Sequence, residues 1–130
     1  MSNTRILYVA SEINPFLELS HVAEFVKKLP QVMQEKGMEI RILVPRFGII
    51  NERRNRLHEV VRLSGINIDV GNEEKPLIIK VASIPAAKLQ VYFIDNEDYF
   101  KRKHVFHDKN DEFYEDNDER AIFFCKGVLE

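Results

Sequence analysis

Four polar side chains lie in one short turn near the start of the chain, in the order Glu18, Ser20, His21 and Glu24. An apolar run, Ile6 to Ala10, precedes the turn, and a segment with helical spacing follows it. A turn between a strand and a helix is a common phosphate-binding place, because the first turn of a helix has unpaired backbone N–H groups. Such turns usually carry glycines, which let the backbone approach the ligand. This turn has none, so the sequence raises the question of whether it binds a phosphate at all.

Two further groups of residues could in principle bind a metal or act as a nucleophile, but the sequence around them favours structural roles. His104 and His107 lie three residues apart beside Asp108, which suits a metal pair only if a helical backbone and further ligands are present. We interpret this stretch as an exposed polar loop and predict no metal site. The single cysteine, Cys125, falls on an apolar helical face, so we predict a buried and inert thiol.

A basic cluster and several aromatic residues could also bind a ligand. The sequence NERRNR at 51–56, together with Arg46, could hold a phosphate, another anionic ligand or the acidic surface of a partner. The alternative is a solvated loop. The aromatic side chains offer flat faces for stacking on sugars, although alternation along a strand would place one of the first two in the core. These aromatic residues are Tyr92, Phe93, Tyr99 and Phe100.

Composition limits the class of protein. The 130 residues suit one compact domain, and the formal net charge of −2 argues against a nucleic-acid binder. A single cysteine excludes a disulfide within the chain and favours a reducing compartment. The short apolar run near the N-terminus is unlike a signal peptide, and no apolar stretch is long enough to cross a membrane. We therefore expect a cytoplasmic protein with no membrane partner.

The first half of the chain has the pattern of a strand–helix–strand unit. The run 6–10 predicts a strand buried on both faces, and 40–44 predicts a second strand that ends at Pro45. Between them, Ser20 is a suitable N-cap and Gly37 a suitable residue to end the helix. Pro30 predicts a kink, or two abutting helices. The helical spacing predicts an apolar stripe of Val22, Phe25, Val26, Leu29, Val32 and Met33.

The second half reads as short strands followed by one helix. Apolar runs at 60–63, 66–70, 77–81 and 89–94 predict the strands. Turn residues at Gly65, Gly71-Asn72, Pro76 and Pro85 separate them, which indicates a hairpin or meander. Asp116 and Glu119 have the spacing of a capping box, and the helix behind them has an apolar face of Ala121, Phe124, Cys125, Val128 and Leu129. We predict an α/β, Rossmann-like fold with a mostly parallel sheet, helices on both faces and a β-hairpin excursion.

Several stretches, in the same order along nearly the whole chain, resemble bacterial glycogen synthases and plant starch synthases. ILYVASEINPF is similar to the family's first strand and its Ser-Glu-x-x-Pro-Phe turn. The segment from VAEFVKKLP to VPRFGII carries the family's Leu-Pro within the helix and Pro-Arg-aromatic-Gly after the next strand. VYFIDNEDYF and YEDNDERAIFF resemble the family's aromatic turn and its Asp-Asn-x-x-Arg-Phe helix start.

The resemblance implies an activity and a place in a larger protein. Family members transfer glucose from ADP-glucose or UDP-glucose to an α-1,4-glucan, with retention at the anomeric carbon, in a cleft between two Rossmann-like domains (the GT-B architecture). The chain would form part of the N-terminal domain, as a single-domain fragment of a longer protein. The resemblance implies no cofactor, and no catalytic residue falls within these residues. We do not expect the fragment alone to be active, because a cleft enzyme needs both walls.

The family's donor motif, Lys-x-Gly-Gly-Leu-x-Asp, is altered in this chain. Its lysine, implied to contact the donor phosphate, corresponds to Glu18, and its two glycines correspond to Ser20 and His21. Its aspartate corresponds to Glu24, a conservative change that keeps a contact with a sugar hydroxyl possible. By resemblance, these four residues are the candidate donor- or acceptor-binding positions. Glu12 matches the family's Ser-Glu, where we interpret it as scaffold of the loop.

Three functions stay open at this point. The first is a glycogen/starch-synthase-like glucosyltransferase domain acting on a nucleotide-glucose and an α-glucan in the full-length protein. The second is a catalytically degenerate member that serves as a glucan-binding or regulatory interaction module. The third, a nucleotide-binding regulator unrelated to glucans, rests on the fold alone. At the turn, exposed surface positions are the structural alternative for Glu18, His21 and Glu24.

Overall fold

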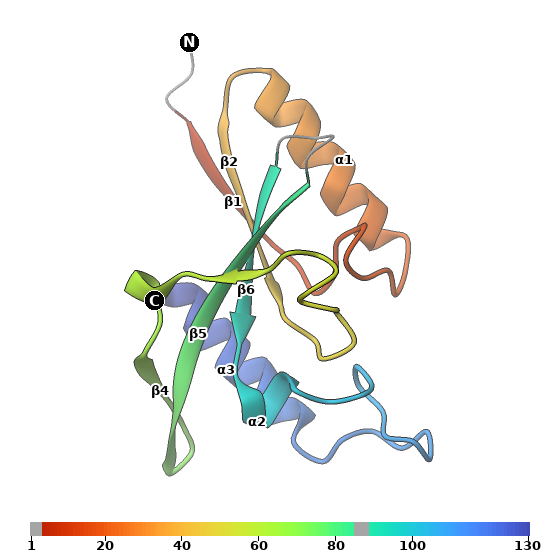
Figure 1. Cartoon of the computed structure of the whole chain (residues 1–130), viewed down its shortest axis with the longest axis vertical. Helices are drawn as coiled ribbons and strands as arrows, with labels where there is room; N and C mark the ends of the chain where they lie inside the picture. Colours follow the sequence, from red (N-terminus) through yellow and green to blue (C-terminus); the bar gives the residue numbers. More distant parts are fainter. Residues whose placement is uncertain (1–3, 85–88) are drawn as a thin grey trace.

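The computed structural model describes residues 4–84 and 89–130, which form one mixed sheet flanked by helices (Figure 1). The strands are β1 (Arg5–Val9), β2 (Glu39–Pro45), β3 (His58–Glu59), β4 (Ile66–Val70), β5 (Glu73–Ile84) and β6 (Leu89–Asp95). The helices are α1 (Val22–Glu35), the short α2 (Glu97–Phe100) and α3 (Asn117–Leu129), and a 3-10 turn, η1, covers Val61–Leu63.

The sheet joins a parallel part to an antiparallel part. Its strand order is β1-β2-β6-β5-β3, with β4 paired to β5 outside that path. β1 and β2 are parallel, as are β2 and β6, whereas β5 runs antiparallel to β6, β3 and β4. β4 and β5 form a hairpin whose turn includes Gly71 at a φ of +63°, a value that favours glycine. The predicted α/β class, the first strand–helix–strand unit and the hairpin are therefore confirmed.

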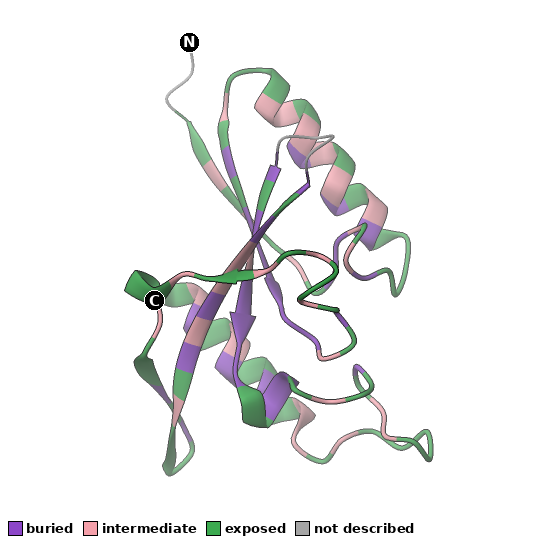
Figure 2. Ribbon diagram, viewed as in Figure 1, coloured by how far each residue is buried: buried purple, intermediate pink, exposed green. Residues whose placement is uncertain are grey.

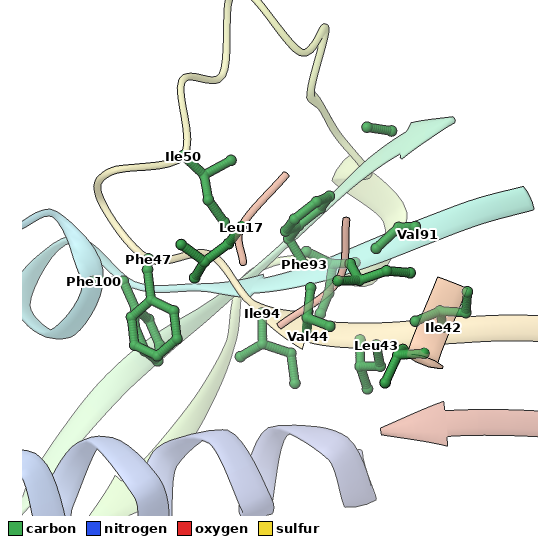
Figure 3. Close-up of a cluster of buried hydrophobic side chains, with 14 of the residues drawn as sticks. Leu17, Ile42, Leu43, Val44, Phe47, Ile50, Val91, Phe93, Ile94 and Phe100 are labelled. Carbon is green, nitrogen blue, oxygen red and sulfur yellow. The ribbon is translucent and has the colours of Figure 1, made fainter. Parts of the chain in front are cut away.

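The two faces of the sheet are covered by different segments. Phe16, in the turn before α1, packs edge-on against Phe93 of β6, with ring centroids 5.2 Å apart. The next residue of β6, Ile94, points to the other face, where its side chain meets α3 at Gly127. Figure 3 shows this division, with Leu17 and Ile50 above the strands and α3 below them. Figure 2 shows that the buried residues follow the central strands.

The burial predicted for the first strand is wrong on one face. Leu7 and Val9 are 50% and 47% exposed. The reason is position, because β1 is the edge strand and α3 lies over β4 and β6.

Two boundaries predicted for the middle of the chain are also wrong. The stretch 60–63 is not a strand. The Ser64 hydroxyl accepts a hydrogen bond from Ile79 N–H of β5 at 3.0 Å and donates one to Val60 C=O. This side chain therefore satisfies a β5 group that a continuing strand would otherwise pair with. Pro76 does not end a strand but lies within β5, opposite Asn67 of β4. β6 begins to pair with β5 only at Ile78, so the missing N–H of Pro76 interrupts no pairing on that side. Pro85 lies outside the described residues.

The apolar stripe of α1 is rotated from the predicted one. The residues buried against the sheet are Ala23, Val26 and Pro30, whereas Phe25 is 62% exposed. Val22 and Val32 are exposed as well. α1 is a single helix from Val22 to Glu35 with Pro30 inside it, so the alternative of two abutting helices is wrong.

α3 differs from the prediction in its cap and in the face that it buries. Asp116 is the residue before the helix, but its side chain makes no capping hydrogen bond. Its carboxylate instead binds the Arg102 guanidinium through two contacts of 2.5 Å. The buried positions are Arg120, Phe123 and Gly127, and Cys125 is exposed, so the predicted buried thiol is wrong.

Candidate functional site

The candidate site lies where the parallel strands end. β1 leads into Ser11 and Glu12, β2 into Arg46 and Phe47, and β6 into Asn96. The carboxyl ends of these three parallel strands meet at one edge of the sheet, which is where open α/β sheets bind their ligands. The turn 11–21, which carries Glu18, Ser20 and His21, leaves from this edge, and Glu24 lies in the first turn of α1.

Glu12 organises the turn. Its side chain is buried, and its carboxylate accepts hydrogen bonds from Leu19 N–H, from Ser20 N–H at 2.8 Å and from the Ser20 hydroxyl at 2.7 Å. Burial alone would raise the pKa of Glu12, but these three hydrogen bonds favour the charged form, and the pKa is lowered. The interpretation of Glu12 as scaffold of the loop is confirmed.

The hydrogen bonds to Glu12 decide what Ser20 can do. The Ser20 backbone N–H already donates to the Glu12 carboxylate, so this N–H is not available to a bound phosphate. α1 begins one residue later than predicted, with His21 rather than Ser20 at the N-cap position. The Ser20 hydroxyl still accepts a hydrogen bond from Val22 N–H at 3.2 Å. Ser20 therefore stabilises the start of the helix while holding the Glu12 carboxylate.

Glu18 and Glu24 converge on one amide. Asn14 Nδ2 donates to Glu24 at 2.7 Å and to Glu18 at 3.2 Å. The hydrogen bond from Asn14 is the main reason that the pKa of Glu24 is lowered, and Lys28 lies 3.6 Å from the same carboxylate. His21, beside them, is exposed. The structure thus brings the carboxylates of Glu18 and Glu24 together, close enough for like charges to repel.

A buried ion network supports the same edge of the sheet from within. The Arg46 guanidinium lies 3.0 Å from the Asp95 carboxylate, and both side chains are almost fully buried. Lys80 Nζ lies 2.7 Å from the second Asp95 oxygen and also contacts Glu52. Burial alone would lower the pKa of Lys80, but Asp95 and Glu52 raise it. The sequence interpretation placed Arg46 with the surface arginines of 51–56, and no local pattern reveals its partner.

A cavity of about 230 Å³ opens beside Ser11 and Pro45, next to the strand ends. Its lining is mostly aromatic, with Phe47, Phe106 and Phe124 among the contributors. Arg120 also lines it: this buried side chain donates to Tyr99 C=O, Val105 C=O and Asn117, whereas its second terminal nitrogen has no partner. Burial lowers the pKa of Arg120 to about 10, which leaves it charged at neutral pH.

The aromatic and histidine candidates fall in different places from those expected of a binding surface. Tyr99 and Phe100 are both buried, and of the two only Phe100 lines the cavity. Phe93 is fully buried and Tyr92 half-buried, as the predicted alternation requires. Phe106, which the sequence interpretation did not single out, is 39% exposed and lines the cavity. The sequence gives little indication that Phe106 lines a cavity, because this residue lies in a polar loop.

The two loop histidines differ: His104 is exposed, whereas His107 has a packing role. His107 stacks on Phe113, with ring centroids 4.1 Å apart, and the two residues form an isolated β-bridge. Within the described ranges 4–84 and 89–130, no group of three or more histidine, cysteine or carboxylate side chains is placed to hold a metal ion. In the same residues, every helix is too short or too polar to cross a membrane.

Comparison of this fold with solved structures gives its class. The catalytic domain of starch synthase IV from Arabidopsis thaliana, solved with ADP and acarbose bound, superposes on 98% of this chain with a TM-score of 0.72. The sequences are 20% identical there, and the match covers 25% of that structure. The chain therefore has the α/β fold of a part of a starch synthase catalytic domain.

Sequence comparison then gives the family. Residues 5–130 match the model of the starch synthase catalytic domain. The chain is 43% identical over 129 residues to the glycogen synthase of Chlorobium limicola, and 44% identical over 131 residues to that of Chlorobium luteolum. Each match covers 98% of this chain and 26% of the relative. The chain belongs to the starch synthase catalytic domain family and spans about a quarter of the length of these curated relatives.

Proposed function

We propose that this chain is an N-terminal part of a cytoplasmic, bacterial glycogen-synthase-like enzyme. The full-length protein would transfer glucose from ADP-glucose or UDP-glucose to an α-1,4-glucan. The observation that carries the proposal is the family match over residues 5–130, together with the carboxyl ends of three parallel strands that meet at one edge of the sheet. The 130 residues alone are not expected to transfer glucose.

The cavity beside Ser11 supports a role of this edge in binding the glucan. Aromatic faces suit the C–H faces of glucose, and Phe106 presents such a face. The Arg120 guanidinium, which lies over the rings of Phe47, Phe100 and Tyr114, places a positive charge beside the cavity. We therefore place the α-glucan acceptor, rather than the donor phosphates, against this edge.

The turn favours a second candidate function. Glu18 and Glu24 share the Asn14 amide, and Glu12 occupies the N–H groups of Leu19 and Ser20. A diphosphate at this turn would meet two carboxylates and few free N–H groups, which disfavours its binding. A catalytically degenerate, glucan-binding or regulatory module of the same fold is the function that this observation favours.

Transfer of labelled glucose to glycogen by the full-length protein discriminates between the two functions. The natural protein is compared with the variant Glu18→Lys/Ser20→Gly/His21→Gly, using ADP-glucose and UDP-glucose as donors. Because Ser20→Gly also removes a hydroxyl bond to Glu12, thermal unfolding of the variant is measured alongside. Binding of maltoheptaose by both proteins reports on the acceptor separately.

The proposed enzyme predicts transfer by the natural protein with at least one donor. Absence of transfer by the natural protein, with glucan binding retained, would exclude the enzyme and establish the binding module. Transfer only by the variant would also establish the binding module and would locate the loss of activity in the turn.

A further inference from the structure

A second cavity, of about 590 Å³, lies between the basic loop 51–57 and the end of the β5–β6 pair. Arg54 and Arg56 are the charged residues of its lining. Asn55, His58, Ser83 and Gln90 also line it, and Ser83 and Gln90 are cross-strand partners. No acidic residue is among the described residues that line this cavity.

The two arginines are free to bind a ligand. The ion pairs formed by the described part of the chain use other cations, so neither Arg54 nor Arg56 has a carboxylate partner there. Unpaired guanidinium groups around a concave surface recognise anions with several oxygens, because each can donate two hydrogen bonds.

The loop that carries these arginines is held in a defined shape. Asn51 accepts a hydrogen bond from Arg54 N–H through its side chain at 2.8 Å, and its backbone carbonyl accepts two bonds from Asn55. Glu52 contacts Lys80, which is tied to the buried Asp95. The loop is therefore fixed to the core by its acid, while its arginines are left unpaired.

The backbone at Arg56 adds an independent observation. Its φ of +56° lies in the left-handed region, where a side chain other than glycine, asparagine or aspartate is uncommon and strained. Strain of this kind concentrates at functional positions. Here the residue that bears the strain is also one that lines the cavity.

We propose that this cavity is a binding site for a small phosphate monoester, with the Arg54 and Arg56 guanidinium groups contacting the phosphate. The volume suits a phosphorylated metabolite rather than a bare ion. The cavity is lined by Pro15 and Phe16 of the turn 11–21 but by none of residues 18–24, and the proposal does not rest on the transfer activity.

Titration calorimetry on the full chain tests the proposal, with glycerol 3-phosphate and inorganic phosphate as probes and glycerol as the neutral reference. We expect glycerol 3-phosphate to bind more tightly than phosphate, glycerol not to bind, and affinity to fall with added salt. Losing a charge-assisted hydrogen bond should weaken binding by about tenfold for each of Arg54→Gln and Arg56→Gly. Arg56→Gly also relieves the backbone strain, so unfolding of the chain does not account for a loss of binding.

Arg53→Gln is the matched control, because Arg53 is an exposed arginine of the same loop that does not line the cavity. Its affinity for glycerol 3-phosphate should stay within about twofold of the natural chain. The proposal is overturned if neither phosphate probe binds, if the Arg54→Gln/Arg56→Gly variant binds as well as the natural chain, or if Arg53→Gln weakens binding equally. Binding of phosphate and glycerol 3-phosphate with equal affinity would reduce the site to a simple anion site and would also contradict it.

Discussion

Arg46 and Asp95 form an ion pair of 3.0 Å in the interior, where they join the carboxyl ends of two neighbouring parallel strands, β2 and β6. Asp95 also binds Lys80, and Lys80 in turn binds Glu52 at the start of the basic loop. One buried carboxylate thus connects the carboxyl ends of two parallel strands to the loop that lines the proposed phosphate site.

Removing the Asp95 charge should destabilise the chain strongly. Asp95→Asn leaves Arg46 buried without a counter-charge, a change that costs about 3–5 kcal/mol in buried pairs. Urea unfolding monitored by circular dichroism measures the loss. Asp98→Asn is the control, since the Asp98 carboxylate is 67% exposed and should change the free energy of unfolding by less than about 1 kcal/mol. Equal effects of the two substitutions would show that the buried pair is not important for stability.

The turn before α1 should be sensitive to acid because of Glu12. Its pKa is lowered in the folded chain, so its contribution to stability is complete above its ordinary value of 4.5 and is lost as the pH falls through the lower folded value. Glu12→Gln should cost about 1–3 kcal/mol at neutral pH, through the loss of hydrogen bonds to a charge. The difference between the natural chain and this variant should shrink below about pH 4.

Comparing the two proteins at each pH isolates Glu12 from other carboxylates. Asp116, whose pKa is lowered mainly by its hydrogen bonds with Arg102, loses stability in the same acid range but is common to both chains. Glu18→Gln is the matched control, because Glu18 is exposed. If the difference in free energy of unfolding between the natural chain and Glu12→Gln stays constant from neutral pH down to about pH 3, the assigned role of Glu12 is contradicted.

The sequence was sufficient for the fold because its strongest signals are local. The apolar run of β2, stopped by Pro45, and Gly37 after α1 predict the strand–helix–strand unit without reference to distant residues. Errors arose where a neighbour decides the outcome. Val61–Leu63 turns away from β5 because Ser64 supplies the missing hydrogen bonds, and Cys125 is exposed because Phe123 and Gly127 face the sheet.

The candidate site could be predicted only in part, because some of its contacts are local in sequence and others are not. The resemblance located the turn and Glu12, since they form one contiguous motif. The pairing of Arg46 with Asp95 and the hydrogen bonds of Arg120 to Tyr99 and Val105 join residues that are distant in sequence, and the sharing of the Asn14 amide depends on how the turn folds back on α1. No spacing rule relates them, and only the three-dimensional arrangement reveals that Ser20 N–H is already occupied.

Gly48 should tolerate no side chain. A Cβ at this position would lie 2.7 Å from Phe100 C=O and would overlap the backbone of Arg102, and neither backbone can move without displacing the end of α2. We expect Gly48→Ala to lower the free energy of unfolding by more than about 3 kcal/mol, because overpacking against backbone is not relieved by rotamer changes. Gly127→Ala is the matched control: its Cβ would meet only the tips of Ile94 and Leu77 side chains, at 3.1 and 3.2 Å.

Alanine also favours a helix over glycine by about 1 kcal/mol, so Gly127→Ala should stay within about 1 kcal/mol of the natural chain. Urea unfolding of both variants makes the comparison. A mild effect of Gly48→Ala would show that residues 100–102 can move away from Gly48, and the close approach of these two segments would then not be required.

Cys125 should react with a thiol reagent in the folded chain. The side chain is exposed on α3, whereas the residues that pack against the sheet are Phe123 and Gly127. We expect its rate of reaction with 5,5′-dithiobis(2-nitrobenzoate) to be within about tenfold of the rate in urea, because access to the thiolate limits the reaction. The control is Phe123→Cys in a Cys125→Ser background, whose buried thiol should react only after unfolding. If Cys125 in the natural chain is protected to the same degree as that buried thiol, the orientation of α3 on the sheet is wrong.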